Sequence, residues 1–359
     1  MKVLTVLGAR PQFIKATPVS LALQAHGHEE ILVHTGQHYD YQMSKVFFDE
    51  LPLAEPAVNL GIGGGQHGGQ TGRMLIALEE VVLDRKPDIV LVYGDTNSTL
   101  AGALVASKLR IVLAHVESGL RSFNRDMPEE INRVLTDHCS DIFFCPTATA
   151  VENLAREGIT RKVELVGDTM CDAIRLFPPS AERSERLFAA HGVAAKNYVL
   201  ATIHRPANTD DPRALSEIMG ALAALEQRVI FPLHPRTRGK LSDHGIVEST
   251  TSELGSIRFI DPVGYLDMLA LERSASVIVT DSGGIQKEAH IFAVPCVTAR
   301  DETEWLETLG DGWNVLVGHD AERIKAAVQQ GLAKSEQAPP ACFGDGHAAG
   351  RIAVLLGRG

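Results

Sequence analysis

The chain has 359 residues, 45% of them hydrophobic and 22% charged, a composition typical of a folded protein large enough for two domains. Its net charge of −11 disfavours nucleic acid as a partner, since the surface as a whole repels polyanions. No apolar run reaches the roughly 18 residues that a membrane-spanning helix needs, so we expect a soluble protein with no membrane partner.

The N-terminus and the cysteines indicate a cytoplasmic protein. Residues 1–8 carry one lysine and an apolar run too short for the core of a signal peptide, so they predict a first core strand. The five cysteines form no CxxC pair, and four of them lie in apolar or helical contexts; they are Cys139, Cys145, Cys171, Cys296 and Cys342. We therefore expect reduced thiols.

Short β-branched runs alternate with amphipathic stretches along the chain. In the first half, strands are predicted at Val3–Leu7, Ile31–Thr35, Ile89–Tyr93, Ile111–Val116, Ile142–Cys145 and Val163–Val166. In the second half, they are predicted at Tyr198–Ile203, Val229–Leu233, Ile257–Ile260, Ser276–Thr280 and Pro295–Thr298. This alternation predicts an α/β protein built from βαβ units, with parallel sheets covered by helices on both faces.

A weakly patterned stretch rich in Pro, Ser and charge, Phe177–Arg183, separates the two series of strands. We place the domain hinge near it and expect Rossmann-like domains over residues 1–172 and 173–345. Ligands of such sheets bind beyond the carboxyl ends of the strands, which predicts a cleft between the two domains.

Unusual polar residues end or directly follow seven of the predicted strands, where a ligand of such sheets would bind. They are Gly8-Ala9-Arg10, Gly94-Asp95-Thr96, His115-Val116-Glu117, His204-Arg205, His234, Asp281-Ser282-Gly283-Gly284 and Arg300. Seven such coincidences are hard to ascribe to chance, although each alone would be weak.

The turn Ser282-Gly283-Gly284 opens a predicted helix and favours an anion, because glycines let backbone N–H groups approach a ligand closely. Several groups near strand ends can add positive charge: Arg10, Lys15, His204, Arg205, His234, Arg236 and Arg300. Together they predict a nucleotide diphosphate site, with Glu288 accepting from ribose hydroxyls. The plainer alternative for the turn is an ordinary helix cap, and for Glu288 it is a solvated carboxylate on a helix surface.

Two other patterns, a glycine-rich motif and the histidines, could indicate a dinucleotide and a metal ion, but each lacks part of the expected signal. Gly63–Gly68 matches G-x-G-x-x-G, but no full strand precedes it, so we interpret it as a glycine-rich loop beside the cleft. His115 and Glu117 share a strand face, and His204 and His234 follow separate strands, but no third ligand accompanies either pair. We therefore expect no metal and no cofactor.

Three carboxylates lie at or near strand ends of the first half: Asp95, Glu117 and Glu129, the last beside Pro128, which marks a helix start. Each could simply pair with Arg121, Arg125 or Arg133. Three together, with a diphosphate site in the same protein, indicate acid/base work on the sugar of a nucleotide sugar.

Several motifs resemble the bacterial non-hydrolysing UDP-N-acetylglucosamine 2-epimerases in order and spacing, over nearly the whole chain. They are Gly8-Ala9-Arg10-Pro11-Gln12-Phe13-Ile14-Lys15, Gly94-Asp95-Thr96-Asn97-Ser98-Thr99, His115-Val116-Glu117-Ser118-Gly119-Leu120-Arg121, Pro128-Glu129-Glu130-Ile131-Asn132-Arg133 and Thr280–Glu288. The resemblance implies a GT-B-type fold, a last helix over residues 346–357 that packs on the first domain, and a homodimer. It also implies inversion at sugar C2 without metal or nicotinamide.

By the same resemblance, the UDP contacts are Arg10, His234, Ser282, Gly283, Gly284, Glu288 and Arg300. The catalytic set is Asp95, Glu117, Glu129, Lys15 and His204, with Arg133 in support. The expected sugar-binding residues are Arg121, Arg125 and Arg133. The C2 hydrogen has no neighbouring carbonyl, so we expect anti elimination of UDP to a 2-acetamidoglucal, followed by re-addition with a proton on the other face. Two faces require two proton-transfer groups, and the positive cluster stabilises the departing UDP.

Departures from the common pattern favour a uronate substrate. The segment Leu120–Pro128 is short and carries Arg125, while Gly8–Phe13, Gly68–Arg73 and Thr303-Glu304-Trp305 resemble the subgroup acting on UDP-2,3-diacetamido-2,3-dideoxyglucuronate. Arg125 or Arg121 could pair with the C6 carboxylate, although Arg125 could instead pair with Asp126 or Glu129. The alternatives are UDP-GlcNAc as substrate, a GT-B glycosyltransferase, a hydrolysing epimerase and an inactive nucleotide-sugar sensor.

Overall fold

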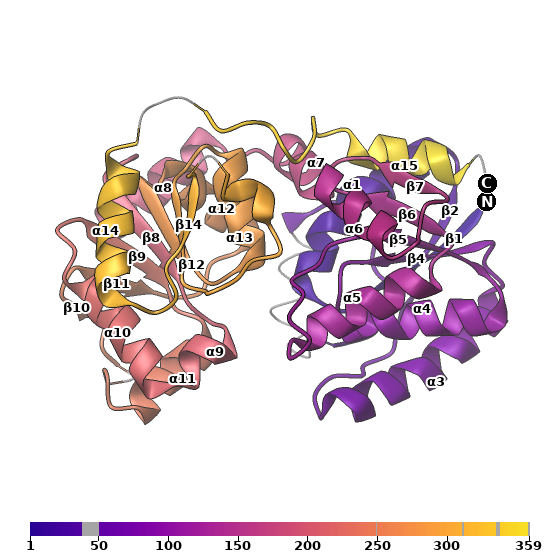
Figure 1. The fold of residues 1–359 in the computed structure, drawn as a ribbon, viewed down its shortest axis with the longest axis horizontal. Helices are drawn as coiled ribbons and strands as arrows, with labels where there is room; N and C mark the ends of the chain where they lie inside the picture. The colour runs from indigo at the N-terminus through magenta and orange to yellow at the C-terminus, as the bar shows by residue number, and fades with distance from the viewer. Residues whose placement is uncertain (38–49, 249, 311, 335–337, 358–359) are drawn as a thin grey trace. The chain divides into compact units, whose positions relative to one another are not determined.

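The computed structural model describes residues 1–37, 50–248, 250–310, 312–334 and 338–357 (Figure 1). The chain forms two compact units, each with its own seven-stranded sheet. Unit 1 comprises Met1–Phe177 and Cys342–Gly359, and unit 2 comprises Pro178–Ala341.

The sheet of unit 1 has the strand order β3-β2-β1-β4-β5-β6-β7, and all its described pairings are parallel. Its strands are β1 (Lys2–Leu7), β2 (Glu29–His34), β3 (Val58–Asn59), β4 (Ile89–Tyr93), β5 (Val112–Val116), β6 (Ile142–Cys145) and β7 (Val163–Leu165). The order reverses at β1 and β4, so the loops after these neighbouring strands diverge and leave room for polar side chains.

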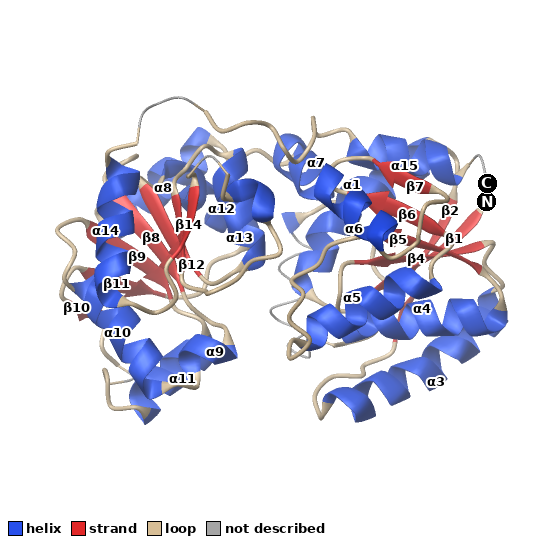
Figure 2. Cartoon of the chain, in the orientation of Figure 1, coloured by secondary structure: helices blue, strands red, loops and turns tan. Residues whose placement is uncertain are grey.

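Helices cover both faces of this sheet, because the strand residues on both faces are apolar (Figure 2). The helices of unit 1 are α1 (Arg10–Ala25), α3 (His67–Arg85), α4 (Asn97–Leu109), α5 (Pro128–Cys139), α6 (Ala148–Arg156), α7 (Thr169–Leu176) and α15 (Ala348–Leu356). Val3 and Leu7 pack with residues of α1 and α15, whereas Leu4 and Val6 pack with residues of α3 and α4. Asp172 on α7 accepts hydrogen bonds from the backbone of Ala348 and Ala349, which fixes the start of α15.

The sheet of unit 2 has the order β10-β11-β9-β8-β12-β13-β14, and only the pairing of β10 with β11 is antiparallel among its described pairings. Its strands are β8 (Tyr198–Thr202), β9 (Arg228–Pro232), β10 (Glu253–Leu254), β11 (Ile257–Ile260), β12 (Val277–Thr280), β13 (Cys296–Thr298) and β14 (Asn314–Leu316). The order reverses at β8 and β12, the two strands after which His204 and Asp281 follow.

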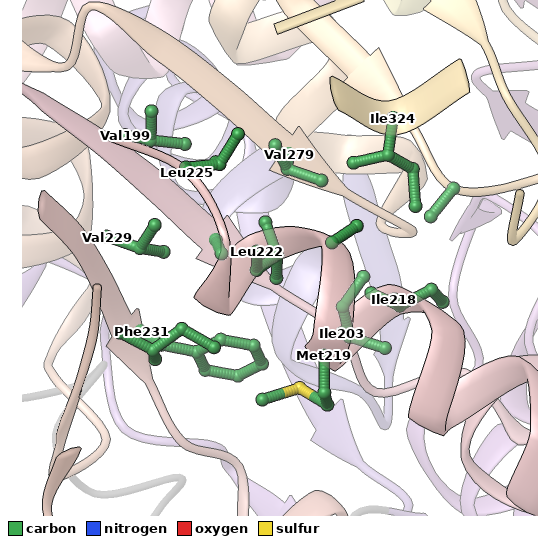
Figure 3. Close-up of a cluster of buried hydrophobic side chains, with 14 of the residues drawn as sticks. Val199, Ile203, Ile218, Met219, Leu222, Leu225, Val229, Phe231, Val279 and Ile324 are labelled. Carbon is green, nitrogen blue, oxygen red and sulfur yellow. The ribbon is translucent and has the colours of Figure 1, made fainter. Parts of the chain in front are cut away.

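The helices of unit 2 are α8 (Ala181–His191), α9 (Pro206–Thr209), α10 (Pro212–Ala223), α11 (Pro235–Asp243), α12 (Tyr265–Ser274), α13 (Gly283–Ile291), the 3-10 helix η1 (Leu306–Thr308) and α14 (Ala321–Leu332). On one face of the sheet, Val199, Phe231 and Val279 pack against Leu222 of α10 and Ile324 of α14 (Figure 3). On the other face, strand residues pack against α8, α12 and α13. The two apolar layers, one on each face of the sheet, hold the ends of the strands in place. The candidate site residues of unit 2 follow these strand ends.

The α/β class with two Rossmann-like sheets, as expected from the sequence, is confirmed. Three predicted strands, Ile89–Tyr93, Ile142–Cys145 and Ile257–Ile260, have the predicted bounds. Three strands, β3, β10 and β14, were not predicted from the sequence; they lie at sheet edges and have only two or three residues. Among the described residues, no helix is both long enough and apolar enough to cross a bilayer.

Candidate active site

The turn between β1 and α1 is held by Gln12. Its side-chain oxygen accepts hydrogen bonds from the backbone N–H groups of Gly8 and Ala9, at 2.7 and 2.9 Å. Its amide nitrogen donates to the carbonyl of Tyr93 at 2.8 Å, at the end of β4. Gln12 therefore joins the two loops at the reversal of the strand order, and it places half-buried Arg10 at the first position of α1.

Lys15 on α1 and Glu117 after β5 form an ion pair, which lies beside the turn that follows β4. A Cβ atom on Gly94 would lie 3.2 Å from the Glu117 carboxylate and 3.9 Å from the Lys15 ammonium, so both groups lie against the backbone next to Asp95. Glu117 itself has φ of +70°, a backbone conformation that costs a residue with a side chain about 1–3 kcal/mol. Such a conformation persists only where the surroundings enforce it, and it is common at functional sites.

Asp95 is fixed from the other side by α5. Arg133 donates from Nη2 to the Asp95 carboxylate and from Nη1 to Glu130 at 2.9 Å. Asn132 donates to the backbone carbonyl of Asp95 at 3.0 Å. The structure therefore brings Lys15, Asp95, Glu117 and Arg133 together in unit 1, as two carboxylates that each lie against a cation.

Three buried side chains, those of Asp137, His115 and Arg121, form a network next to these turns. The Asp137 carboxylate pairs with His115 at 2.7 Å and with Arg121 at 2.7 Å, and it accepts from the backbone N–H of Gly119 at 3.1 Å. Burial acts to raise the pKa of Asp137, but the hydrogen bonds and charges of His115 and Arg121 outweigh it and lower that pKa. Arg121 also forms two 2.7 Å hydrogen bonds with Glu157 and is 3% exposed. The carboxylates of Asp137 and Glu157 therefore engage the Arg121 guanidinium within the chain, and it is not on the exposed side of the loop.

Glu129 and Glu130 are neighbours on α5 but have different surroundings. Glu129 is exposed, whereas Glu130 is buried and accepts from the backbone of Ser122 and Phe123, at 2.9 Å in each case. Glu130 therefore fixes the loop that leads to Arg125. Arg125 is exposed and forms no ion pair with a described residue, so the pairing with Asp126 or Glu129 considered above is absent from the described part of the chain.

In unit 2, the buried Asp281 organises the loop after β8. Its carboxylate accepts from the backbone N–H groups of His204, at 3.1 Å, and Arg205, at 2.9 Å, and from the side chain of Asn208 at 3.0 Å. Nδ1 of His204 lies 3.4 Å from the same carboxylate, and the imidazole remains 40% exposed. A buried carboxylate that holds a partly exposed histidine sets the orientation of its ring.

His234 lies next to His204, with 5.9 Å between the ring centroids. It forms the N-cap of α11, where its Nδ1 accepts from the backbone N–H of Arg236 at 3.1 Å. Acceptance at Nδ1 requires the tautomer with a proton on Nε2, so Nε2 is a donor. Arg236, by contrast, pairs with Asp210 at 2.6 Å and is exposed.

The turn Ser282-Gly283-Gly284 begins α13, and all three residues are half-buried. A Cβ atom on Gly283 would lie 2.4 Å from the Glu304 carboxylate, whereas a Cβ atom on Gly284 would meet nothing closer than 3.9 Å. Arg300 pairs with Glu304 at 3.0 Å and is 8% exposed. Its Nη1 is buried and has no hydrogen-bond partner among the described residues. Open backbone N–H groups with an unused guanidinium nitrogen nearby suit an anionic ligand.

Glu288 lies one turn further along α13 and is 5% exposed. A solvated helix carboxylate was the plainer expectation, and the burial of Glu288 contradicts it. In the described residues, no group of three or more His, Cys, Asp or Glu side chains could hold a metal ion. The glycine-rich segment Gly63–Gly68 follows the short strand β3, and its last two residues begin α3. The Arg73 guanidinium donates to the carbonyl of Gly64 at 3.1 Å.

Sequence reasoning missed the residues that hold the others in place: Gln12, Glu130, Asp137 and Glu304. Gln12 and Glu130 each stand inside a motif quoted above, and a helix-start glutamine that can bond back to the N-cap is a recognisable signal. Asp137 has no such local signal, because its partners His115 and Arg121 lie 22 and 16 residues away in the chain. Glu304 pairs with Arg300, four residues before it, and stands inside the quoted segment Thr303-Glu304-Trp305.

Known proteins are similar to this chain over nearly its whole length. The family described as UDP-N-acetylglucosamine 2-epimerase matches residues 21–357. The chain is 49% identical to UDP-2,3-diacetamido-2,3-dideoxy-D-glucuronate 2-epimerase of Pseudomonas aeruginosa, over 100% of both chains. It is 47% identical to UDP-N-acetylglucosamine 2-epimerase of Methanococcus maripaludis, over 99% of this chain and 98% of that one. The crystal structure of the Methanocaldococcus jannaschii UDP-GlcNAc 2-epimerase with UDP-GlcNAc and UDP is similar with a TM-score of 0.93 and 46% identity, over 100% of both chains.

Proposed function

Because the chain belongs to the UDP-N-acetylglucosamine 2-epimerase family, we propose that it inverts C2 of a UDP-2-acetamido sugar by elimination and re-addition of UDP. One observation carries the mechanism. Two carboxylates, Asp95 and Glu117, follow the neighbouring strands β4 and β5, and each lies against a cation, Arg133 and Lys15. Such a pair can serve two opposite faces of one carbon.

In the proposed reaction, a carboxylate takes the C2 proton, the C2–H electrons form the C1=C2 double bond, and UDP leaves with the C1–O electrons. The intermediate is a 2-acetamidoglucal. UDP then attacks C1 again, while a second acid delivers a proton to the other face of C2. Asp95, Glu117 and Glu129 are the candidate proton carriers, and Lys15 and His204 offer positive charge or a proton where negative charge develops.

For UDP itself, we propose the contacts Arg10, His234, Ser282, Gly283, Gly284, Glu288 and Arg300. Three features support this assignment: the open approach at Gly284, the unused Nη1 of Arg300 and the Nε2 donor of His234. Each charge-assisted hydrogen bond contributes about 1.5–3 kcal/mol, so a few suffice to hold UDP through the elimination step. Neither a metal nor a nicotinamide is part of the proposal.

As the substrate we propose UDP-2,3-diacetamido-2,3-dideoxyglucuronate, converted to the mannuronate. Arg125 supports a uronate, because it is an exposed guanidinium without an ion pair among the described residues, on a loop fixed by Glu130. The Pseudomonas aeruginosa relative bears the name of this reaction. Among the three predicted sugar-binding arginines, we assign the carboxylate contact to Arg125, since Arg121 and Arg133 are already engaged by Asp137 and Asp95.

UDP-GlcNAc, converted to UDP-ManNAc, is the second candidate substrate. The relative from Methanococcus maripaludis named for that reaction has an identity only slightly lower, 47% against 49%. A panel of both UDP-sugars, assayed side by side for kcat/KM, distinguishes the two candidates.

The reaction class is tested by incubating the protein with each UDP-sugar alone in D2O. We expect C2 inversion, with deuterium at C2 of substrate and product, and no accumulation of free UDP. A requirement for an acceptor would indicate a glycosyltransferase instead, and stoichiometric release of UDP would indicate a hydrolysing epimerase. We also propose a cytoplasmic homodimer, which sedimentation of the purified protein tests for its oligomeric state.

A further inference from the structure

A second carboxyl group lies behind Glu288 in the core of unit 2. Glu272 on α12 is 0% exposed, and its carboxyl group lies within hydrogen-bonding reach of the Glu288 carboxyl group on α13. Neither oxygen of Glu272 receives a hydrogen bond from a nitrogen or hydroxyl donor among the described residues. Two carboxyl groups can be hydrogen-bonded to each other only if one of them carries a proton.

Among the described residues, no cation pairs with the Glu272 carboxyl group, and Lys196, near it in space, donates to the carbonyls of Arg273 and Ala275 instead. Tyr198 of β8 donates its hydroxyl to the Leu271 carbonyl at 2.6 Å, and Cys296 of β13 faces Thr298. On α8, which packs against α12, Arg183 and Arg186 pair with Asp267 instead. Burial, then the charge and hydrogen bond of Glu288, raise the pKa of Glu272 well above its ordinary value. The proton of the pair therefore belongs on Glu272, the more deeply buried partner.

We propose that Glu272 is a neutral carboxylic acid that donates a hydrogen bond to the Glu288 carboxylate and so fixes it to accept from the ribose hydroxyl groups of UDP. Glu272 is then a positioning residue, which acts through Glu288 and does not touch the ligand. The inference rests on the proposed function, in that Glu288 is the ribose contact. It adds the reason why Glu288, 5% exposed, keeps one orientation and remains an acceptor.

The test compares binding of UDP and 2′,3′-dideoxy-UDP by calorimetry. In the wild-type protein we expect UDP to bind at least tenfold more tightly, because only UDP offers the ribose hydroxyls. Glu272→Leu removes the donor while filling a similar volume, and should reduce the ratio of the two Kd values to within about twofold of one. Glu272→Gln keeps a donor of the same length and should keep the wild-type ratio.

Tyr198→Phe is the matched control, because it removes a buried hydroxyl beside Glu272 without changing the carboxyl pair, and its ratio should stay as in the wild type. A wild-type ratio retained in Glu272→Leu would overturn the positioning role. Absence of UDP binding in the wild type would instead refute the proposed function. If Glu272→Leu does not fold, infrared spectroscopy of the wild type and of Glu272→Gln tests whether Glu272 is protonated. A protonated-carboxyl band at neutral pH in the wild type, lost in Glu272→Gln, supports the proposal, and its absence from the wild type overturns it.

Discussion

Nδ1 of His115 lies 2.7 Å from Oδ1 of Asp137, and neither side chain is exposed. The other ring nitrogen of His115 lies 2.8 Å from the carbonyl of Gly94, the residue before Asp95. A carbonyl accepts only, so Nε2 carries a proton, and His115 connects Asp137 to the turn that bears a candidate catalytic carboxylate. His115 also precedes Glu117 by two residues, so one buried pair fixes both turns.

Asp137→Ala should destabilise the protein by about 3–5 kcal/mol, because it leaves Arg121 and His115 buried without their carboxylate. The measurement is urea unfolding at pH 7. Glu152→Ala, which breaks an exposed pair with Arg156, is the control and should change the unfolding free energy by less than about 1 kcal/mol. Equal effects of the two substitutions would contradict the assigned network.

The same carboxylate predicts a pH dependence. The pKa of Asp137 is lower in the folded protein than in the unfolded chain, so the unfolded chain binds more protons as the solution is acidified. Its contribution to stability is therefore complete above the unfolded pKa of about 4 and is lost as the pH falls below that value. Urea midpoints measured from pH 7 down to pH 3 should fall more steeply for the wild type than for Asp137→Ala.

Glu117→Gln should lower kcat about 10²- to 10⁴-fold, the usual contribution of a general acid or base. UDP affinity should change less than about threefold, because Glu117 lies in unit 1 beside Lys15 and is not among the proposed UDP contacts. The assays are deuterium incorporation at C2 and calorimetry with UDP. A comparable loss in affinity would show that Glu117 holds the ligand rather than moving a proton.

Arg300→Gln should weaken UDP binding about 10- to 100-fold, the equivalent of the 1.5–3 kcal/mol of a charge-assisted hydrogen bond. The reason is the buried Nη1, which no described residue uses. Arg228→Gln serves as the control, since Arg228 is exposed and pairs with Glu253 on the outermost strand of the same sheet. Unchanged affinity in Arg300→Gln would remove this residue from the UDP site.

Gly284→Ala should leave the unfolding free energy within about 1 kcal/mol of the wild type, because the added methyl group meets no atom closer than 3.9 Å. UDP affinity should nevertheless fall at least tenfold, since the methyl group lies where a phosphate would approach the backbone. Thermal unfolding and calorimetry measure the two effects separately. Wild-type affinity in this variant would show that the phosphates bind elsewhere.

Arg125→Ala should lower kcat/KM for the diacetamido-glucuronate about 10- to 100-fold and leave kcat/KM for UDP-GlcNAc within about threefold, since only the uronate carries a C6 carboxylate. Arg110→Ala, a change at the left-handed cap of α4, is the charge-matched control. Equal losses on both sugars would refute the uronate contact of Arg125.

The sequence by itself determined the α/β class and most of the strands, because long apolar β-branched runs form buried strands in almost any context. It also determined which residues lie at strand ends, because a residue that directly follows a strand in the sequence must lie at the end of that strand in space. Edge strands such as β3 and β14 were missed because two or three residues carry no periodicity. Only the tertiary structure distinguished Glu129 from Glu130, or placed Arg121 against Asp137, because burial depends on segments distant in sequence. The pairing of Glu272 with Glu288 likewise arises from the packing of α12 against α13, where burial and like charge together decide which carboxyl keeps the proton.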